Sequence, residues 1–161
     1  MDSGILAPIV ITTIDAKAIG DKCEFSKNIP GKETDTEALF LKGIRVAREE
    51  DGVKIFEGTL VADAKEFQKL IHDVAQKNGA DQILLYVHGF TVTPSGILED
   101  TAKMNAYYAS LGRGVPKAFV IPVIWPSEPK NYSKQKKIAP CAAVALRSLL
   151  PNFKQTMPVS I

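Results

Sequence analysis

A histidine and a glycine stand directly after an apolar stretch of the chain. Residues 83–87 read ILLYV, and His88 and Gly89 follow at once. An apolar run of this length is typical of a strand that is buried on both faces, as strands of parallel α/β sheets are. Glycine lets the backbone turn sharply and approach a ligand, so that free N–H groups can face a developing negative charge. The pattern therefore predicts part of an oxyanion hole after this strand.

Two roles are open for His88. It can orient the turn by hydrogen-bonding backbone groups, or it can serve as a catalytic base. A base needs a nucleophile within about 3 Å, and the sequence suggests none nearby, so we favour the structural role. The other histidine, His72, is expected at the surface or boundary of a helix. Two separated histidines predict no metal site, and we expect no cofactor.

Three further side chains are candidate nucleophiles by type. Ser95 in TPSG and Ser127 in WPSE stand beside proline or glycine, so each is expected to shape a turn or cap a helix. Cys141 stands near a predicted helix start, where the helix dipole lowers a thiol pKa. The alanines around Cys141 favour a small apolar packing role instead.

Composition limits the classes of partner. The 161 residues are 45% hydrophobic, which is ordinary for a globular domain with a core. Twenty Lys and Arg against 18 Asp and Glu leave a net charge of +2, which supplies no general field for nucleic acid or an anionic membrane. The lysine-rich stretch 130–137 is expected to be a solvated loop and helix entrance. No run approaches the roughly 18 apolar residues of a membrane span.

The two cysteines, Cys23 and Cys141, lie far apart and show no CxxC spacing, which argues against a disulfide scaffold and favours a reducing compartment. We expect a soluble, cytoplasmic protein.

The segment Ile5 to Ile14 has no basic residue before it, so it is expected to be a strand rather than a signal peptide. Residues 20–37 are polar and broken by Gly and Pro, which predicts a loop or linker.

Hydrophobic periodicity and turn signals predict the remaining elements. Asp51-Gly52 favours a β-hairpin turn, Asp63 with Glu66 begins a helix, and Pro122 implies a bulge or an unpaired position in its strand. The predicted elements are strands at about 39–47 and 53–61, a helix at 64–77, a strand at 83–87, a helix at 96–111, a strand at 118–125 and a helix at about 138–150. This order predicts an α/β fold, with an N-terminal hairpin followed by parallel βαβ units and three main helices. We divide the chain into 1–37, an N-terminal strand and polar linker, and 38–161, the α/β domain.

The motifs also resemble a known family. A strand followed by His88-Gly89-Phe90, then a helix, then a strand ending in Trp125-Pro126-Ser127 resembles the first half of an α/β-hydrolase. The pattern is similar to that of an uncharacterised branch with HGF or HGY after one strand and WPS after the next. The resemblance covers about residues 38–150. It implies a partial α/β-hydrolase-like sheet and the chemistry of a carboxylic ester or similar acyl bond.

The resemblance also assigns roles to residues. It implies that the backbone N–H of Phe90 donates to the oxyanion, with Thr91 as a second contributor. The implied oxyanion-hole and substrate-binding residues are His88, Gly89, Phe90 and Thr91, and the candidate cleft-lining residues are Trp125 and Ser127.

The catalytic machinery of that family is not found in these residues. No serine has glycine both two positions before and two positions after it, and Ser110 in YASLG has only the later one. We therefore expect a truncated or degenerate hydrolase-like domain without catalytic residues of its own. Whether it is an enzyme stays open, and the alternative is a noncatalytic binding or interaction module.

If the strand that leads to the nucleophile in this family is absent, the sheet should change. In the family, the strand that carries His-Gly lies between the WPS strand and the strand that leads to the nucleophile. Without the latter, strand 83–87 would be a flat apolar edge that invites pairing. We expect Ile5 to Ile14, a second copy of the chain, or a separate partner to cover this edge. A small ester-like ligand is the expected small-molecule partner.

Overall fold

The computed structural model describes residues 4–12, 17–19, 22–25, 39–61, 63–88, 93–125 and 159–160. The strands are β1 (Ile5–Thr12), β2 (Lys17–Ile19), β3 (Lys22–Phe25), β4 (Leu39–Glu50), β5 (Val53–Leu60), β6 (Gln82–Val87), β7 (Ala118–Ile124) and β8 (Val159–Ser160). The helices are α1 (Ala64–Lys77) and α2 (Pro94–Ala109). The third predicted helix, at about 138–150, lies outside the described residues.

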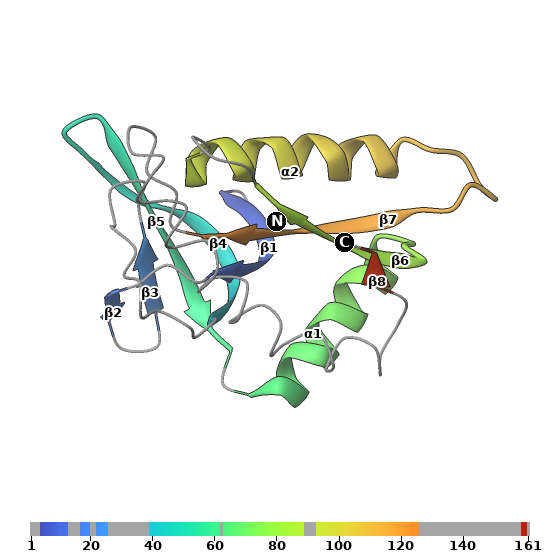
Figure 1. Cartoon of the computed structure of the whole chain (residues 1–161), viewed down its shortest axis with the longest axis horizontal. Helices are drawn as coiled ribbons and strands as arrows, with labels where there is room; N and C mark the ends of the chain where they lie inside the picture. Colours follow the sequence, from blue (N-terminus) through green and yellow to red (C-terminus); the bar gives the residue numbers. More distant parts are fainter. Residues whose placement is uncertain are drawn as a thin grey trace, which may run out of the picture.

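The strands form one mixed sheet in the order β2-β3-β5-β4-β1-β7-β6-β8. Pairing is antiparallel from β2 to β1, and parallel from β1 through β7 and β6 to β8. Helices α1 and α2 lie on opposite faces of the parallel half (Figure 1). The α/β class is therefore confirmed, with two helices in the described part of the chain.

The hairpin and the first helix follow the predictions. Asp51 and Gly52 both have positive φ, of 51° and 76°, as the turn that matches strand twist requires. Helix α1 has the predicted bounds, and the Asp63 carboxylate accepts the Glu66 backbone N–H at 2.7 Å. Helix α2 begins at Pro94 rather than at the predicted Gly96, because the Thr93 hydroxyl accepts the Gly96 N–H at 3.1 Å and so caps an earlier turn.

Of the two alternatives predicted for Pro122, a bulge or an unpaired position, the bulge is wrong and the unpaired position fits the structure. The register between β6 and β7 passes through Tyr86 and Pro122 without a shift. Backbone groups of alternate strand residues point to the same edge, so the missing N–H of Pro122 lies on the same side as the N–H of Val120. That side faces β1, and β1 pairs with β7 only from Val123 onward. The ladder to β6 therefore needs no donor from Pro122.

Two apolar layers sandwich the sheet. The layer under α1 joins Ile9, Ile11, Phe67, Ile71, Ala75, Ile83, Leu85, Phe119, Ile121 and Val123, with Val61. The layer on the α2 side joins Ala7, Val10, Cys23, Phe25, Leu41, Ile44, Phe56, Ile97, Leu98 and Ile124. Phe119, Ile121 and Val123 of β7 enter the α1 layer and Ile124 enters the α2 layer, as the two-residue period of a strand requires.

The N-terminal region differs from two expectations. Part of the predicted polar linker, Lys22–Phe25, is strand β3, and its Cys23 and Phe25 are buried at alternate positions. The rest of 20–37 lies outside the described residues. β1 confirms the predicted N-terminal strand over Ile5–Thr12, yet it pairs with β4 and β7 rather than with β6.

The proposal that the N-terminal strand covers the β6 edge is therefore wrong. β1 is buried on both faces, with Ile9, Val10 and Ile11 at most 1% exposed, so it takes an interior position between two strands. On the far side of β6 lies β8, which pairs at Ile83 and Leu84.

Candidate functional site

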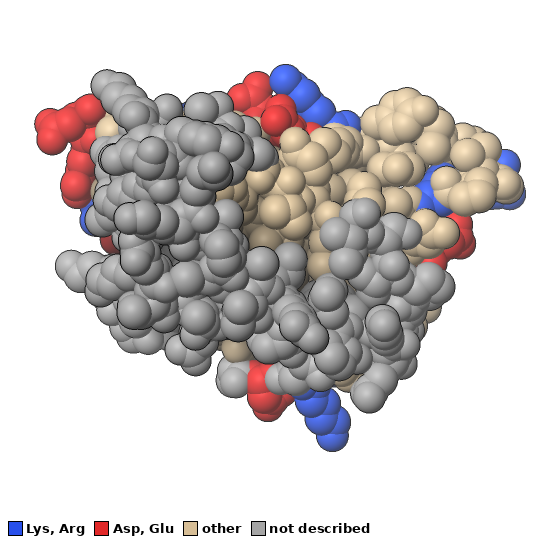
Figure 2. Space-filling view, viewed as in Figure 1, with Lys and Arg blue, Asp and Glu red and all other residues tan. Residues whose placement is uncertain are grey.

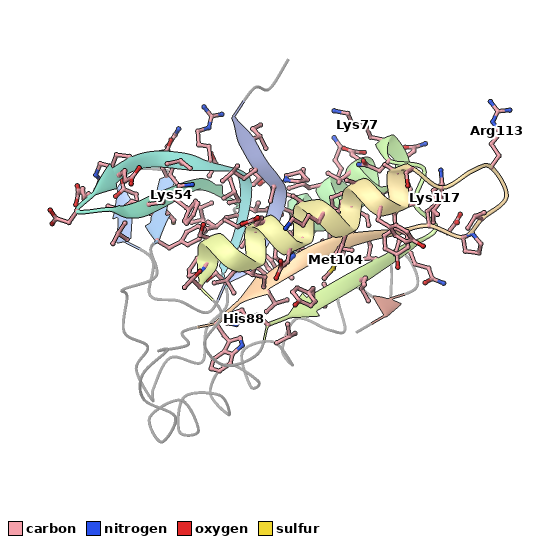
Figure 3. All side chains as sticks on the ribbon, turned by 90° about the horizontal axis from the view of Figure 1, so that it is seen from above. Lys54, Lys77, His88, Met104, Arg113 and Lys117 are labelled. Atoms are coloured by element: carbon pink, nitrogen blue, oxygen red, sulfur yellow. The ribbon has the colours of Figure 1, made fainter. Side chains whose placement is uncertain are left out.

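The carboxyl ends of three parallel strands meet at one edge of the sheet. β1 ends at Thr12, β7 at Ile124 and β6 at Val87, and the pairs Thr12–Ile124 and Val87–Val123 place these ends side by side. Ligands of open α/β sheets bind outside the carboxyl ends of parallel strands. His88 follows β6 and stands at this edge (Figure 3). Trp125 follows β7 directly and so lies at the same edge.

His88 and Trp125 interact through hydrogen bonds and through their stacked rings. We call this pair of residues and its interactions the His88–Trp125 bridge. The rings are stacked, with centroids 5.2 Å apart and planes 6° apart. The Trp125 indole N–H donates to the His88 carbonyl oxygen at 2.8 Å. Nε2 of His88 lies 3.1 Å from both the backbone nitrogen and the carbonyl oxygen of Trp125. Both residues are buried, at 3% and 7% exposure.

The bridge engages Nε2 of His88 in either neutral tautomer. Without a proton, Nε2 accepts the Trp125 backbone N–H; with one, it donates to the Trp125 carbonyl. In both cases this nitrogen bonds the backbone of the neighbouring strand end. The favoured structural role of His88, orientation of backbone groups, matches this geometry.

Two further features converge on the same edge. The buried Thr12 hydroxyl donates to the Ile124 carbonyl oxygen at 3.1 Å, which ties the end of β1 to the end of β7. Helix α2 begins at Pro94, a few residues after His88, and has no acidic residue in its first turn. The positive end of its dipole therefore favours a partial negative charge at this edge.

The structure brings together two of the six predicted site residues, His88 and Trp125. The others, Gly89, Phe90, Thr91 and Ser127, lie outside the described residues, as does Cys141. The oxyanion turn stays a prediction. Sequence reasoning missed Thr12, although a polar residue at the end of an apolar strand is a signal that could have marked it.

The remaining candidates have structural positions. His72 is exposed on α1, as expected. Ser95 is the second residue of α2, where Thr93 rather than Ser95 forms the cap. Ser110 follows α2 and donates its hydroxyl to the Tyr107 carbonyl at 2.6 Å, so it shapes a helix end.

The described charged side chains form no cluster at this edge and no metal site. In the view of Figure 2, Lys, Arg, Asp and Glu side chains of both signs lie around the rim of the molecule. Burial raises the pKa of the Cys23 thiol, and hydrogen bonds to Glu24 and Glu50 raise the pKa of Arg48. Within the described ranges, no three His, Cys, Asp or Glu side chains gather in a group that could hold a metal ion.

No family model, curated protein or solved structure matches the chain. Of the two described helices, neither has the length and apolar character that crossing a membrane requires.

Proposed function

We propose that this chain is an α/β-hydrolase-like domain that binds an acyl compound at the carboxyl edge of β6 and β7. The observation that carries the proposal is the His88–Trp125 bridge, which joins the two strand ends where the predicted oxyanion turn begins. The HGF and WPS motifs supply the class of ligand, an ester or similar acyl group. The bound carbonyl oxygen would accept the Phe90 backbone N–H, the donor that the resemblance implies.

This chain is expected to bind the acyl group without hydrolysing it. The sequence contains no GxSxG elbow. Hydrolysis through an acyl-enzyme also needs a base within hydrogen-bond reach of the nucleophile. Nε2 of His88 bonds the Trp125 backbone instead. The described residues at this edge therefore position backbone groups.

A noncatalytic interaction module is the second candidate, and the same bridge favours it. A buried imidazole that holds two strand ends together needs no substrate to explain it. In that case the edge would receive a partner protein, and simple esters would not bind. Measurements on the purified chain separate the two candidates.

Trp125 is the single tryptophan of the chain, so its fluorescence reports directly on this edge. We expect methyl butyrate to change the emission in a saturable way and 1-butanol, which lacks the carbonyl, to leave it unchanged. Absence of a saturable change would contradict acyl binding and favour the interaction module.

A second experiment tests catalysis. We expect no labelling of the chain by a fluorophosphonate probe and no turnover of a chromogenic short-chain ester. Labelling at a serine would contradict the noncatalytic reading.

Two variants test the predicted donor. Phe90→Ala keeps the backbone N–H of this position, whereas Phe90→Pro removes it. If that N–H holds the carbonyl, the proline variant loses methyl butyrate binding and the alanine variant retains most of it. Equal binding by both variants would place the donor elsewhere.

A further inference from the structure

A pocket of about 580 Å³ opens between α1 and the antiparallel half of the sheet. Its lining residues are Ile5, Pro8, Lys22, Lys42, Gly43, Arg45, Glu57, Gly58, Thr59, Leu70 and Lys77. Four of them are cations and one is a carboxylate, in a chain whose net charge is only +2. The local excess of positive charge predicts an anionic ligand.

A β-bulge places two of the cations on one face. Lys42 pairs with Thr59 and Arg45 pairs with Glu57, so β4 advances three residues while β5 advances two. Gly43, with φ of 63°, provides the backbone conformation of this bulge. Residues three apart on a regular strand face opposite sides, and the bulge instead turns Arg45 to the side of Lys42. Without it, Arg45 would point into the apolar layer of Ile44.

Neighbouring elements bring the other two cations. Lys22 of β3 pairs with Thr59 from the opposite side of β5, and its ammonium lies 3.4 Å from the Glu57 carboxylate. Lys77 is the last residue of α1. The Lys42 ammonium on β4 lies 3.0 Å from the Glu66 carboxylate on α1, so α1 lies beside this face.

Arg45 and Lys77 differ from the other two cations in their pairing. Within the described residues neither forms an ion pair, although both lie on the pocket wall. Both are exposed, so their charge is available to a ligand from solvent. Two unpaired cations match a dianion better than a monoanion, and the planar Arg fork fits phosphate oxygens in pairs.

The pocket also has an apolar wall. Ile5 and Pro8 of β1 and Leu70 of α1 line it together with the charged groups. A volume of about 580 Å³ falls in the ordinary range for small-molecule sites. The pocket therefore suits a ligand with a charged head and an apolar body.

We infer that this pocket binds an organic phosphate monoester. Arg45 and Lys77 hold the phosphate, the Thr59 hydroxyl adds a hydrogen-bond donor, and the wall of Ile5, Pro8 and Leu70 contacts the organic group. Lys77 lies away from His88 in Figure 3, so this is a second site, separate from the carboxyl edge.

Calorimetric titration of the full chain with phenyl phosphate tests the inference. We expect saturable binding that weakens as ionic strength rises, because the contacts are charged. Inorganic phosphate, without the apolar body, and benzoate, a monoanion, should each bind more weakly. Trp125 fluorescence should stay unchanged in the same titration, because the tryptophan belongs to the other site. Absence of saturable binding, or equal affinity for benzoate, would overturn the inference.

Matched variants locate the site. Arg45→Gln and Lys77→Gln should each lower the affinity for phenyl phosphate by about tenfold or more, the loss expected for one charge-assisted contact. Lys54→Gln removes an exposed cation of β5 outside the pocket and should retain wild-type affinity. All three side chains are exposed, so the variants should keep the wild-type thermal midpoint without ligand. If all three bind phenyl phosphate like the wild type, the phosphate lies elsewhere and the inference fails.

Discussion

At the scale of single residues, His88 is a type of side chain often used in catalysis, yet here its hydrogen bonds link two strand ends. Its ring and carbonyl join it to the next strand end along the sheet, at a depth that excludes water. A buried polar group that loses its partner costs about 1–3 kcal/mol, so the bridge is expected to contribute measurably to the free energy of unfolding.

Replacement of His88 tests this contribution. His88→Ala should lower the free energy of unfolding by about 2–4 kcal/mol, through a cavity and the loss of bonds to the Trp125 backbone. His88→Gln should lose less, because the amide can accept or donate at the position of Nε2. Urea unfolding followed by circular dichroism measures both. Equal, small losses would show that the ring nitrogen contributes nothing to stability.

Gly58 makes a second residue-scale prediction. A Cβ at this position would collide with the Ile44 Cδ1 atom and lie 3.0 Å from the Leu41 Cβ atom. Gly58→Ala should therefore destabilise the fold by about 1–3 kcal/mol through overpacking. Gly112→Ala is the control, because a Cβ there meets nothing within 4 Å. A neutral Gly58→Ala variant would show that the apolar layer can yield.

At the scale of elements, α2 supplies a partner that β7 lacks. The Asn105 amide accepts the Val120 N–H at 2.8 Å and donates to the Val120 carbonyl at 3.0 Å. Those backbone groups face the side where β1 has not yet begun to pair with β7. One helix side chain thus satisfies strand groups that a neighbouring strand would otherwise bond.

Asn105→Ala leaves two backbone groups of a buried strand residue without this partner. We expect a loss of about 2–4 kcal/mol in the free energy of unfolding. Asn105→Asp keeps the acceptor for the Val120 N–H but not the donor for its carbonyl, so the loss should fall between wild type and alanine. Thermal and urea unfolding would check the order, and identical values for the two variants would contradict it.

The bulges of β4 have a comparable effect on their strand. The pairings Lys42–Thr59, Arg45–Glu57 and Arg48–Ile55 set three cations, each three residues apart, on one face. A helix would align such a repeat naturally, whereas a strand requires an extra residue in each step. The pocket beside α1 depends on this irregularity.

At the scale of the whole molecule, the mixed sheet places the two proposed sites apart. Its parallel half ends at the bridge of His88 and Trp125, and its antiparallel half carries the cationic pocket. β7 lies between β1 and β6, with α1 and α2 on opposite faces (Figure 1). This arrangement makes β7 the centre of the core.

Amide hydrogen exchange should reflect that position. We expect the slowest exchange at the buried residues of β7 and β6, and fast exchange at the exposed hairpin tip around Asp51. Measurement by NMR or mass spectrometry on the native chain would test the order. Slower exchange at the tip than in β7 would contradict the assignment of the core.

The sequence alone determined most of the local structure. Apolar runs, the Asp51-Gly52 turn and the Asp63 cap predicted the hairpin, α1, β6 and β7 closely, because these signals act between residues near in the chain. The same signals also predicted that His88 directly follows a buried strand. The polar composition of 20–37 concealed β3, since a four-residue strand has too few positions to show a pattern.

Only the tertiary structure decided which strands are neighbours and which side chains meet. β1 lies beside β7 rather than β6, and the partner of His88 is Trp125, which is 37 residues away. Arg45 reaches the same pocket as Lys77 because of a bulge, and the hydrophobic pattern of the sequence does not predict that bulge. Such contacts depend on strand order, register and helix placement, which burial across the whole sheet selects. Local residue preferences do not encode them.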